Sequence, residues 1–200
     1  MRHEGLVRAT HWINALSFLA LAVSGVAILL AHPRFYWGET GYFDTPAAFS
    51  LPLPVNLDQT GWGRNLHFLG AWITVLNGFV YVGWGLSAGH FRHKLLPTRA
   101  HLDPSHYSLL QRLAYLGIVF GLLPLVILSG LTLSPAITAA YPDLFALFGG
   151  RQSARTIHFL ASDLLLLFLI IHVAMAIRTG FANNIRSMIT GAYTVPAEER

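Results

Sequence analysis

The sequence predicts an all-α integral membrane protein, built as a bundle of four transmembrane helices. Apolar residues make up 54% of the 200 residues and charged residues only 11%, whereas soluble domains carry about 25% charge. The mean hydropathy is +0.53. Four segments lack lysine and arginine, and each is long enough to cross the hydrocarbon layer, which takes about 20 helical residues. Helices are expected because they satisfy their own backbone hydrogen bonds within lipid.

The elements follow one another as four spans joined by three loops. The predicted spans are residues 12–31, 66–86, 113–133 and 156–177. Pro124 is expected to kink the third span, because proline has no backbone N–H to donate. The first loop, residues 32–65, is long and rich in aromatic residues and proline, which favours an interfacial belt or a docking surface. The tail after Arg178 is expected to form an amphipathic helix on the inner surface.

The positive charges predict which side of the membrane each loop faces. With four spans both termini share a side, and that side carries nine lysine and arginine residues against four on the other. The positive-inside rule therefore places both termini in the cytoplasm and the long first loop outside. The net charge of +4 comes from scattered residues, which indicates membrane topology and not nucleic-acid binding. The absence of cysteine excludes disulfides, thiol catalysis and cysteine-bound metals.

Four of the ten histidines lie within a predicted span or at its edge: His11, His67, His158 and His172. An ionisable residue inside a membrane is costly and is a functional candidate by default. His67 and His158 open the second and fourth spans near the outer face, whereas His11 and His172 lie near the inner face. His158 and His172 are fourteen residues apart, about 21 Å of helical rise with an angular offset of only about 40°.

Two imidazoles at one depth, on different helices, can bind one haem iron from both sides. The depths therefore predict two haem irons, with His11 and His172 as one pair of axial ligands and His67 and His158 as the other. Six-coordinate iron has no open position, which suits electron transfer. One alternative is a histidine-based transporter of metal ions or protons, but its ligands would cluster at one depth. Packed structural histidines in a plain anchor are the other alternative.

An arginine precedes three of these histidines by three residues. These arginines are Arg8, Arg64 and Arg155. Each lies about one helical turn closer to water and on roughly the same face as its histidine. Such a guanidinium can pair with a haem propionate. Snorkelling of arginines at helix ends explains the same pattern, so both interpretations stay open.

The segment RATHWINALSFLALAVSG, residues 8–25, resembles the opening of the bacterial membrane di-haem cytochrome b subunits. These include the gamma subunit of formate dehydrogenase and the cytochromes b of nickel–iron hydrogenase and thiosulfate reductase. The segment HFLASDLLLLFLIIH, residues 158–172, is similar to the two-histidine helix of that family. The resemblance extends from residue 8 to about residue 191 and implies one transmembrane cytochrome b domain over residues 1–200. It implies the same two ligand pairs.

The resemblance further implies a multi-pass subunit of the bacterial inner membrane with two haems b. Such a subunit carries electrons between an outer-face oxidoreductase, of molybdopterin or hydrogenase type, and the quinone pool; it is not a stand-alone enzyme, and no catalytic residue is expected. Asn14 is a candidate for binding quinone, as are residues of the inner loop: His93, His101, Asp103, His106 and Tyr107. Asp163, within the fourth span, needs a partner or a neutral state. Its expected partners are Ser162, Thr74 and Asn77, with proton relay as a further role.

Overall fold

The computed structural model describes residues 4–42, 44–91 and 108–192, which are mostly helical. Within these ranges four helical segments are long and apolar enough to cross a membrane. They are α1 (Gly5–Ala31), α2 (Thr60–Ser87), a composite third segment that includes α4 (Leu123–Leu131), and α6 (Arg151–Arg178). The prediction of a mostly helical chain with four helices able to span a membrane is confirmed.

All four spans begin earlier than the sequence predicts. The first begins at Gly5, the second at Thr60, the third at Ser108 and the fourth at Arg151, which is about one to two helical turns before the predicted starts. The predictions were drawn where the apolar run begins. Helices continue past that boundary because polar side chains are solvated in the headgroup region, where the backbone still gains from helical hydrogen bonds.

The third span is interrupted in its middle. It consists of α3 (Ser108–Gly117), a π-helical turn η4 (Ile118–Leu122) and α4, with Pro124 in the first turn of α4. Proline cannot donate the hydrogen bond that a continuous α-helix requires, and a π-turn is a common way to adjust the backbone locally. The irregularity predicted at Pro124 therefore takes the form of a change in helical register just before the proline.

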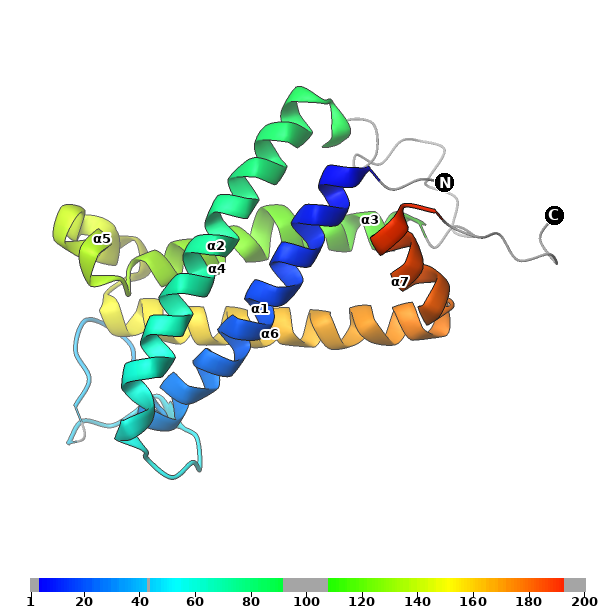
Figure 1. Ribbon diagram of the computed structural model, residues 1–200. Coiled ribbons are helices and arrows are strands. Elements are labelled where there is room, and N and C mark those ends of the chain that lie inside the picture. Colours follow the sequence, from blue (N-terminus) through cyan, green and yellow to red (C-terminus); the bar gives the residue numbers. More distant parts are fainter. Residues whose placement is uncertain (1–3, 43, 92–107, 193–200) are drawn as a thin grey trace.

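The spans pack as two pairs. α1 packs mainly along α2, and α4 packs along α6. Figure 1 shows the α1–α2 pair crossing the α4–α6 pair at a steep angle. The last residues of α1 lie beside the first turn of α6, since Arg155 donates to the carbonyl of His32. The end of α1 therefore meets the start of α6.

The long first loop contains a small folded unit. Strands β1 (Arg34–Phe35) and β2 (Phe49–Ser50) pair antiparallel, with Phe35 opposite Phe49, and a 3₁₀ turn η1 (Leu57–Gln59) leads into α2. Phe35 is 2% exposed. Its ring lies 4.7 Å from the Phe49 ring and 4.3 Å from the Phe159 ring of α6, measured between centroids. This aromatic cluster anchors the loop to the end of the bundle where α6 begins.

The same loop supplies hydrogen-bond partners to the start of α6. The Gly38 carbonyl accepts from the backbone N–H groups of Gln152 and Ser153 at 2.9 and 3.2 Å. In return the Gly38 N–H donates to the Ser153 hydroxyl at 2.8 Å, and the Arg151 N–H donates to the Glu39 carboxylate at 3.1 Å. The first N–H groups of a helix have no partner within it, so the loop completes the N-terminus of α6.

Gly150, directly before α6, is expected to be intolerant of a side chain. Its φ is +116°, and a Cβ there would collide with the backbone of Gly38. We expect Gly150→Ala to lower the free energy of unfolding by at least about 1–3 kcal/mol from backbone strain alone, with the collision adding to it. Thermal unfolding in detergent measures this. Gly180→Ala is the control, because Gly180 has a φ of +100° but nothing within 4 Å of its Cβ position. Equal losses in both variants would show that the contact with Gly38 contributes nothing.

The loop between α4 and α6 carries two short helices, α5 (Pro135–Ala140) and η5 (Pro142–Phe148).

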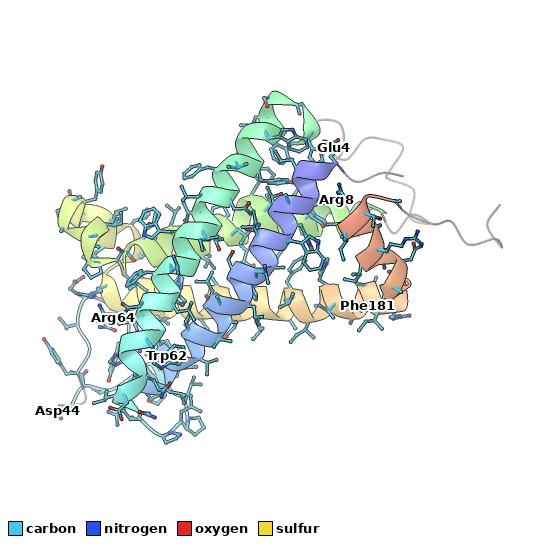
Figure 2. The ribbon with its side chains drawn as sticks, in the orientation of Figure 1. Glu4, Arg8, Asp44, Trp62, Arg64 and Phe181 are labelled. Carbon is cyan, nitrogen blue, oxygen red and sulfur yellow. The ribbon has the colours of Figure 1, made fainter. Side chains whose placement is uncertain are left out.

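The predicted helix after the last span is α7 (Phe181–Thr190). Arg8 donates to the Ile189 carbonyl at 2.6 Å, and the Trp12 indole donates to the Met188 carbonyl at 3.1 Å. These bonds hold α7 against the first turns of α1, and Figure 2 shows Arg8 on the side of α1 that faces α7.

Candidate functional site

The four membrane histidines come together in two pairs. The rings of His67 on α2 and His158 on α6 lie 6.1 Å apart between centroids. The rings of His11 on α1 and His172 on α6 lie 6.3 Å apart. Each pair joins the α1–α2 layer to α6, and α6 contributes to both. Following the orientation predicted from the charges, we call His67–His158 and the end of the bundle that carries it outer, and His11–His172 and its end inner.

Both separations fit a metal held between two imidazoles. A metal–nitrogen bond of about 2 Å on each side, with about 1 Å more from each nitrogen to its ring centre, places the centroids roughly 6 Å apart when one iron joins them. Within residues 4–42, 44–91 and 108–192, no group of three or more His, Asp or Glu side chains gathers to hold a metal ion. Two opposed ligands suit the axial positions of a haem and not the cage that a metal-ion transporter would need.

The outer pair is oriented by hydrogen bonds to neighbouring helices, beginning with His67. Its Nδ1 lies 3.0 Å from the hydroxyl oxygen of Ser24 on α1. The Ser24 hydroxyl donates its own proton to the Ala20 carbonyl at 2.7 Å, so it accepts from the histidine. A Cβ added at Gly25 would lie 3.8 Å from the His67 ring.

His158 is held in the same way on the other side. Its Nδ1 lies 3.0 Å from the Val126 carbonyl and 3.2 Å from the Ser129 hydroxyl oxygen, both on α4. A carbonyl only accepts, so Nδ1 carries the proton, and Nε2 is the nitrogen with a lone pair. A Cβ added at Gly130 would lie 3.0 Å from the ring. Neither serine was predicted as a site residue. The signal available in the sequence was that a Ser-Gly dipeptide occurs in both the first and the third span, at 24–25 and 129–130.

The inner pair is packed among aromatic rings. The Trp12 ring meets the His11 ring edge-on at 5.5 Å between centroids. The Phe168 ring stacks on His172 at 5.8 Å with an interplanar angle of 26°. Trp12 also bonds to α7, so this short helix lies next to the inner pair.

The three arginines have different surroundings. Arg8 donates one bond to α7, and its buried Nε has no hydrogen-bond partner among the described residues, which leaves a donor suited to a carboxylate. Arg155 donates to the carbonyls of His32 and Arg34 and lies over the Phe35 ring, 5.1 Å from its centroid. Arg64 is exposed on α2 near the outer end of the bundle (Figure 2). Arg155 thus has a clear structural role, and pairing of any of the three with a propionate stays a prediction.

His32 lies beside two of these arginines at the outer end of α1. Burial lowers the pKa of its imidazole, and the positive charges of Arg155 and Arg64 lower it further. Because the lowered pKa lies below the ordinary value of about 6.5, the ring is neutral at pH 7. It adds no charge to a region that already carries two guanidinium groups.

Asn14, the quinone candidate, is tied to α2. Its side-chain oxygen accepts from the Asn77 amide at 2.8 Å, and the same Asn77 amide donates to the Thr10 carbonyl at 2.9 Å. This polar bridge joins α1 to α2 near His11. A role of Asn14 in quinone binding stays a prediction, and the inner-loop candidates at 93, 101, 103, 106 and 107 lie outside the described residues.

Asp163 is exposed on α6, and the expected bonds to its three partners are wrong. Ser162 donates to the His158 carbonyl at 2.7 Å. Both bonds of the Asn77 amide go to α1, and the buried Thr74 hydroxyl has no hydrogen-bond partner among the described residues. The physical reason is rotational: Asp163 lies on an exposed face of α6.

Apolar spanning helices that bring opposed imidazoles together inside the bundle define an integral membrane cytochrome of the b type. The chain belongs to the prokaryotic cytochrome b561 family, whose model matches residues 2–191. This confirms the family predicted from the resemblance of residues 8–25 and 158–172. It follows that the protein is a multi-pass membrane protein that binds haem b and serves electron transport.

Two curated relatives cover most of the chain. The "Putative protein-methionine-sulfoxide reductase subunit YedZ1" of Azospira oryzae is 30% identical over 192 residues, which cover 86% of this chain and 88% of the relative. The "Probable Ni/Fe-hydrogenase B-type cytochrome subunit" of Cupriavidus necator is 26% identical over 224 residues, which cover 96% of this chain and 86% of the relative. No solved structure matches the chain.

Proposed function

We propose that this chain is the membrane-anchoring di-haem subunit of an oxidoreductase complex in the bacterial inner membrane. It carries electrons between an outer-face partner and the quinone pool. The observation that carries the proposal is the presence of two opposed imidazole pairs, 6.1 and 6.3 Å between centroids. They lie at levels separated by fourteen residues of α6, about 21 Å of helical rise.

The histidines act as axial ligands in this proposal. Haem, when bound, supplies an iron that gains and loses one electron. His67 and His158 would hold one haem, and His11 and His172 the other. Because two imidazoles would bind each iron, no position of the iron would stay open for oxygen or substrate, which suits transfer of electrons without side reactions. The four apolar spans would place both levels within the hydrocarbon layer of the membrane, away from water.

The proposed orientation places the outer pair on the periplasmic side. The excess of lysine and arginine on the side of both termini supports it. The loop attached to the start of α6 would then face outward, and it carries exposed aromatic side chains such as Trp37, 56% exposed, and Tyr42. Exposed aromatics are typical of docking surfaces. The relatives are named as subunits of a sulfoxide reductase and a hydrogenase, which supports an oxidoreductase partner. The partner type that we propose is molybdopterin or hydrogenase.

The test is a reduced-minus-oxidised visible spectrum of the purified full-length protein, with haem and protein quantified separately. We expect two low-spin haems b per chain and reduction of both by a short-chain quinol in detergent or nanodiscs. One haem per chain would refute the di-haem proposal and show that one histidine pair is misassigned. Absence of haem from protein made under haem-replete conditions would overturn the proposal.

A further inference from the structure

The outer histidines are held by two copies of one local arrangement. On α1 and on α4, a serine followed by glycine faces a histidine of the neighbouring helix. In both copies the histidine Nδ1 lies within 3.2 Å of the serine oxygen. In the copy on α4 the Val126 carbonyl, three residues before the serine, also lies 3.0 Å from the ring nitrogen. Both serines, Ser24 and Ser129, are 0% exposed. The two helix pairs therefore present the two outer rings from opposite sides with the same chemistry.

The hydroxyl groups act as acceptors in both copies. Each serine sends its own proton to the carbonyl four residues earlier, at 2.7 Å. The oxygen that faces the histidine is thus left with lone pairs for the Nδ1–H group. Such bonds fix the ring orientation and the tautomer of a metal-binding histidine, and they raise the basicity of the other nitrogen. A more basic ligand stabilises ferric over ferrous iron, which lowers the reduction potential.

We propose that Ser24 and Ser129 are positioning residues for the outer pair, which aim the Nε2 atoms of His67 and His158 at one iron and lower the reduction potential of the outer haem. The assignment rests on the proposed function, since it concerns the rings as iron ligands. It also implies a chemical difference between the two pairs. Hydroxyl groups would tune the outer pair, whereas aromatic rings contact the inner pair.

A serine that only bonds to its own helix provides the matched control. Ser17 lies on α1 two turns before Ser24, is 5% exposed and donates to the Ile13 carbonyl, as Ser24 does to its own helix. The hydrogen bonds of Ser17 that the structure shows lie within α1. Ser17→Ala therefore reproduces the loss of a buried hydroxyl and of a helix bond, without loss of a bond to an imidazole.

The experiment is a redox titration of the purified full-length holoprotein, followed by visible absorption and by electron paramagnetic resonance of the ferric state. The variants are Ser24→Ala, Ser129→Ala, the double variant, Ser24→Thr and Ser17→Ala. We expect each single alanine variant to raise the potential of one haem component and to shift its low-spin ferric signal, with a larger rise in the double variant. The other haem component is expected to keep its wild-type potential in these variants. Ser17→Ala is expected to match the wild type in both potentials, and Ser24→Thr is expected to restore the wild-type potential.

Selective loss of one haem component in the alanine variants, with Ser17→Ala intact, would also support the assignment. Unchanged potentials and signals in both alanine variants would overturn it, as would an equal shift in Ser17→Ala. A wild-type protein without two low-spin haem components would instead refute the proposed function. The two failures are therefore distinguishable in one data set.

Discussion

Replacement of His158 by alanine is expected to lower the haem content from two per chain to one. His158 supplies one of the two imidazoles of the outer pair, 6.1 Å from the His67 ring, and no third His, Asp or Glu gathers at either pair among the described residues. The iron at that level would keep a single axial ligand in an apolar bundle. Haem per chain is measured by the pyridine haemochrome assay together with quantitative amino-acid analysis.

The complementary variant is His172→Ala, fourteen residues further along the same helix. It is also expected to leave one haem per chain. The remaining haem would be the one at the outer pair, so its spectrum and potential should differ from those of the haem that remains in His158→Ala. His32→Ala is the control, because its ring lies at the outer end of α1, beside Arg155 and Arg64 and outside both pairs. Retention of both haems in His158→Ala would contradict the assignment of the outer pair, and identical residual spectra in His158→Ala and His172→Ala would contradict the pairing.

Gly130→Val is expected to remove most of the outer haem without changing a ligand. A Cβ at this position would lie 3.0 Å from Cε1 and 3.4 Å from Nδ1 of His158, and valine adds two methyl groups beyond it. The ring cannot retreat without breaking its bonds to Val126 and Ser129. Overpacking of this kind costs about 1–3 kcal/mol. This corresponds to a roughly 5- to 150-fold lower population of the ring position that binds haem.

The matched control is Gly78→Val on α2, where a Cβ would meet nothing within 4 Å. It introduces the same side chain into a membrane helix and is expected to retain both haems. Gly130→Ala should fall between wild type and Gly130→Val. Visible spectra and haem content measure all three variants, and a fully loaded Gly130→Val with an unchanged spectrum would show that the ring accommodates the methyl groups.

The sequence contains most of what determines the two histidine pairs. Span length and the positions of the histidines along each span give their depths, and the pitch of a helix places His158 and His172 on one side of α6. Depth alone then suffices to pair them with His67 and His11. The family resemblance is independent support, because it depends on residue identity and not on spacing.

The contacts between helices were harder to predict. Which face of α1 meets α2 depends on how the two helices rotate against each other, so the bond between Ser24 and His67 could not be derived from hydropathy. The same holds for the Asn77 bridge to α1, which occupies the carbonyl of Asn14, and for the exposed position of Asp163. The bonds between Gly38 and α6 join residues more than a hundred positions apart, and no local pattern marks them.

The straight run of α6 between its two histidines also bears on how this protein can change in evolution. One inserted or deleted residue between His158 and His172 would rotate everything beyond it by about 100°, and one of the two haem levels would lose its ligand. Substitutions that keep the segment apolar leave this geometry intact. Relatives that bind haem at both levels can thus differ in the identity of the residues between the two histidines but not in their number. The loops are not under this constraint and can change in length.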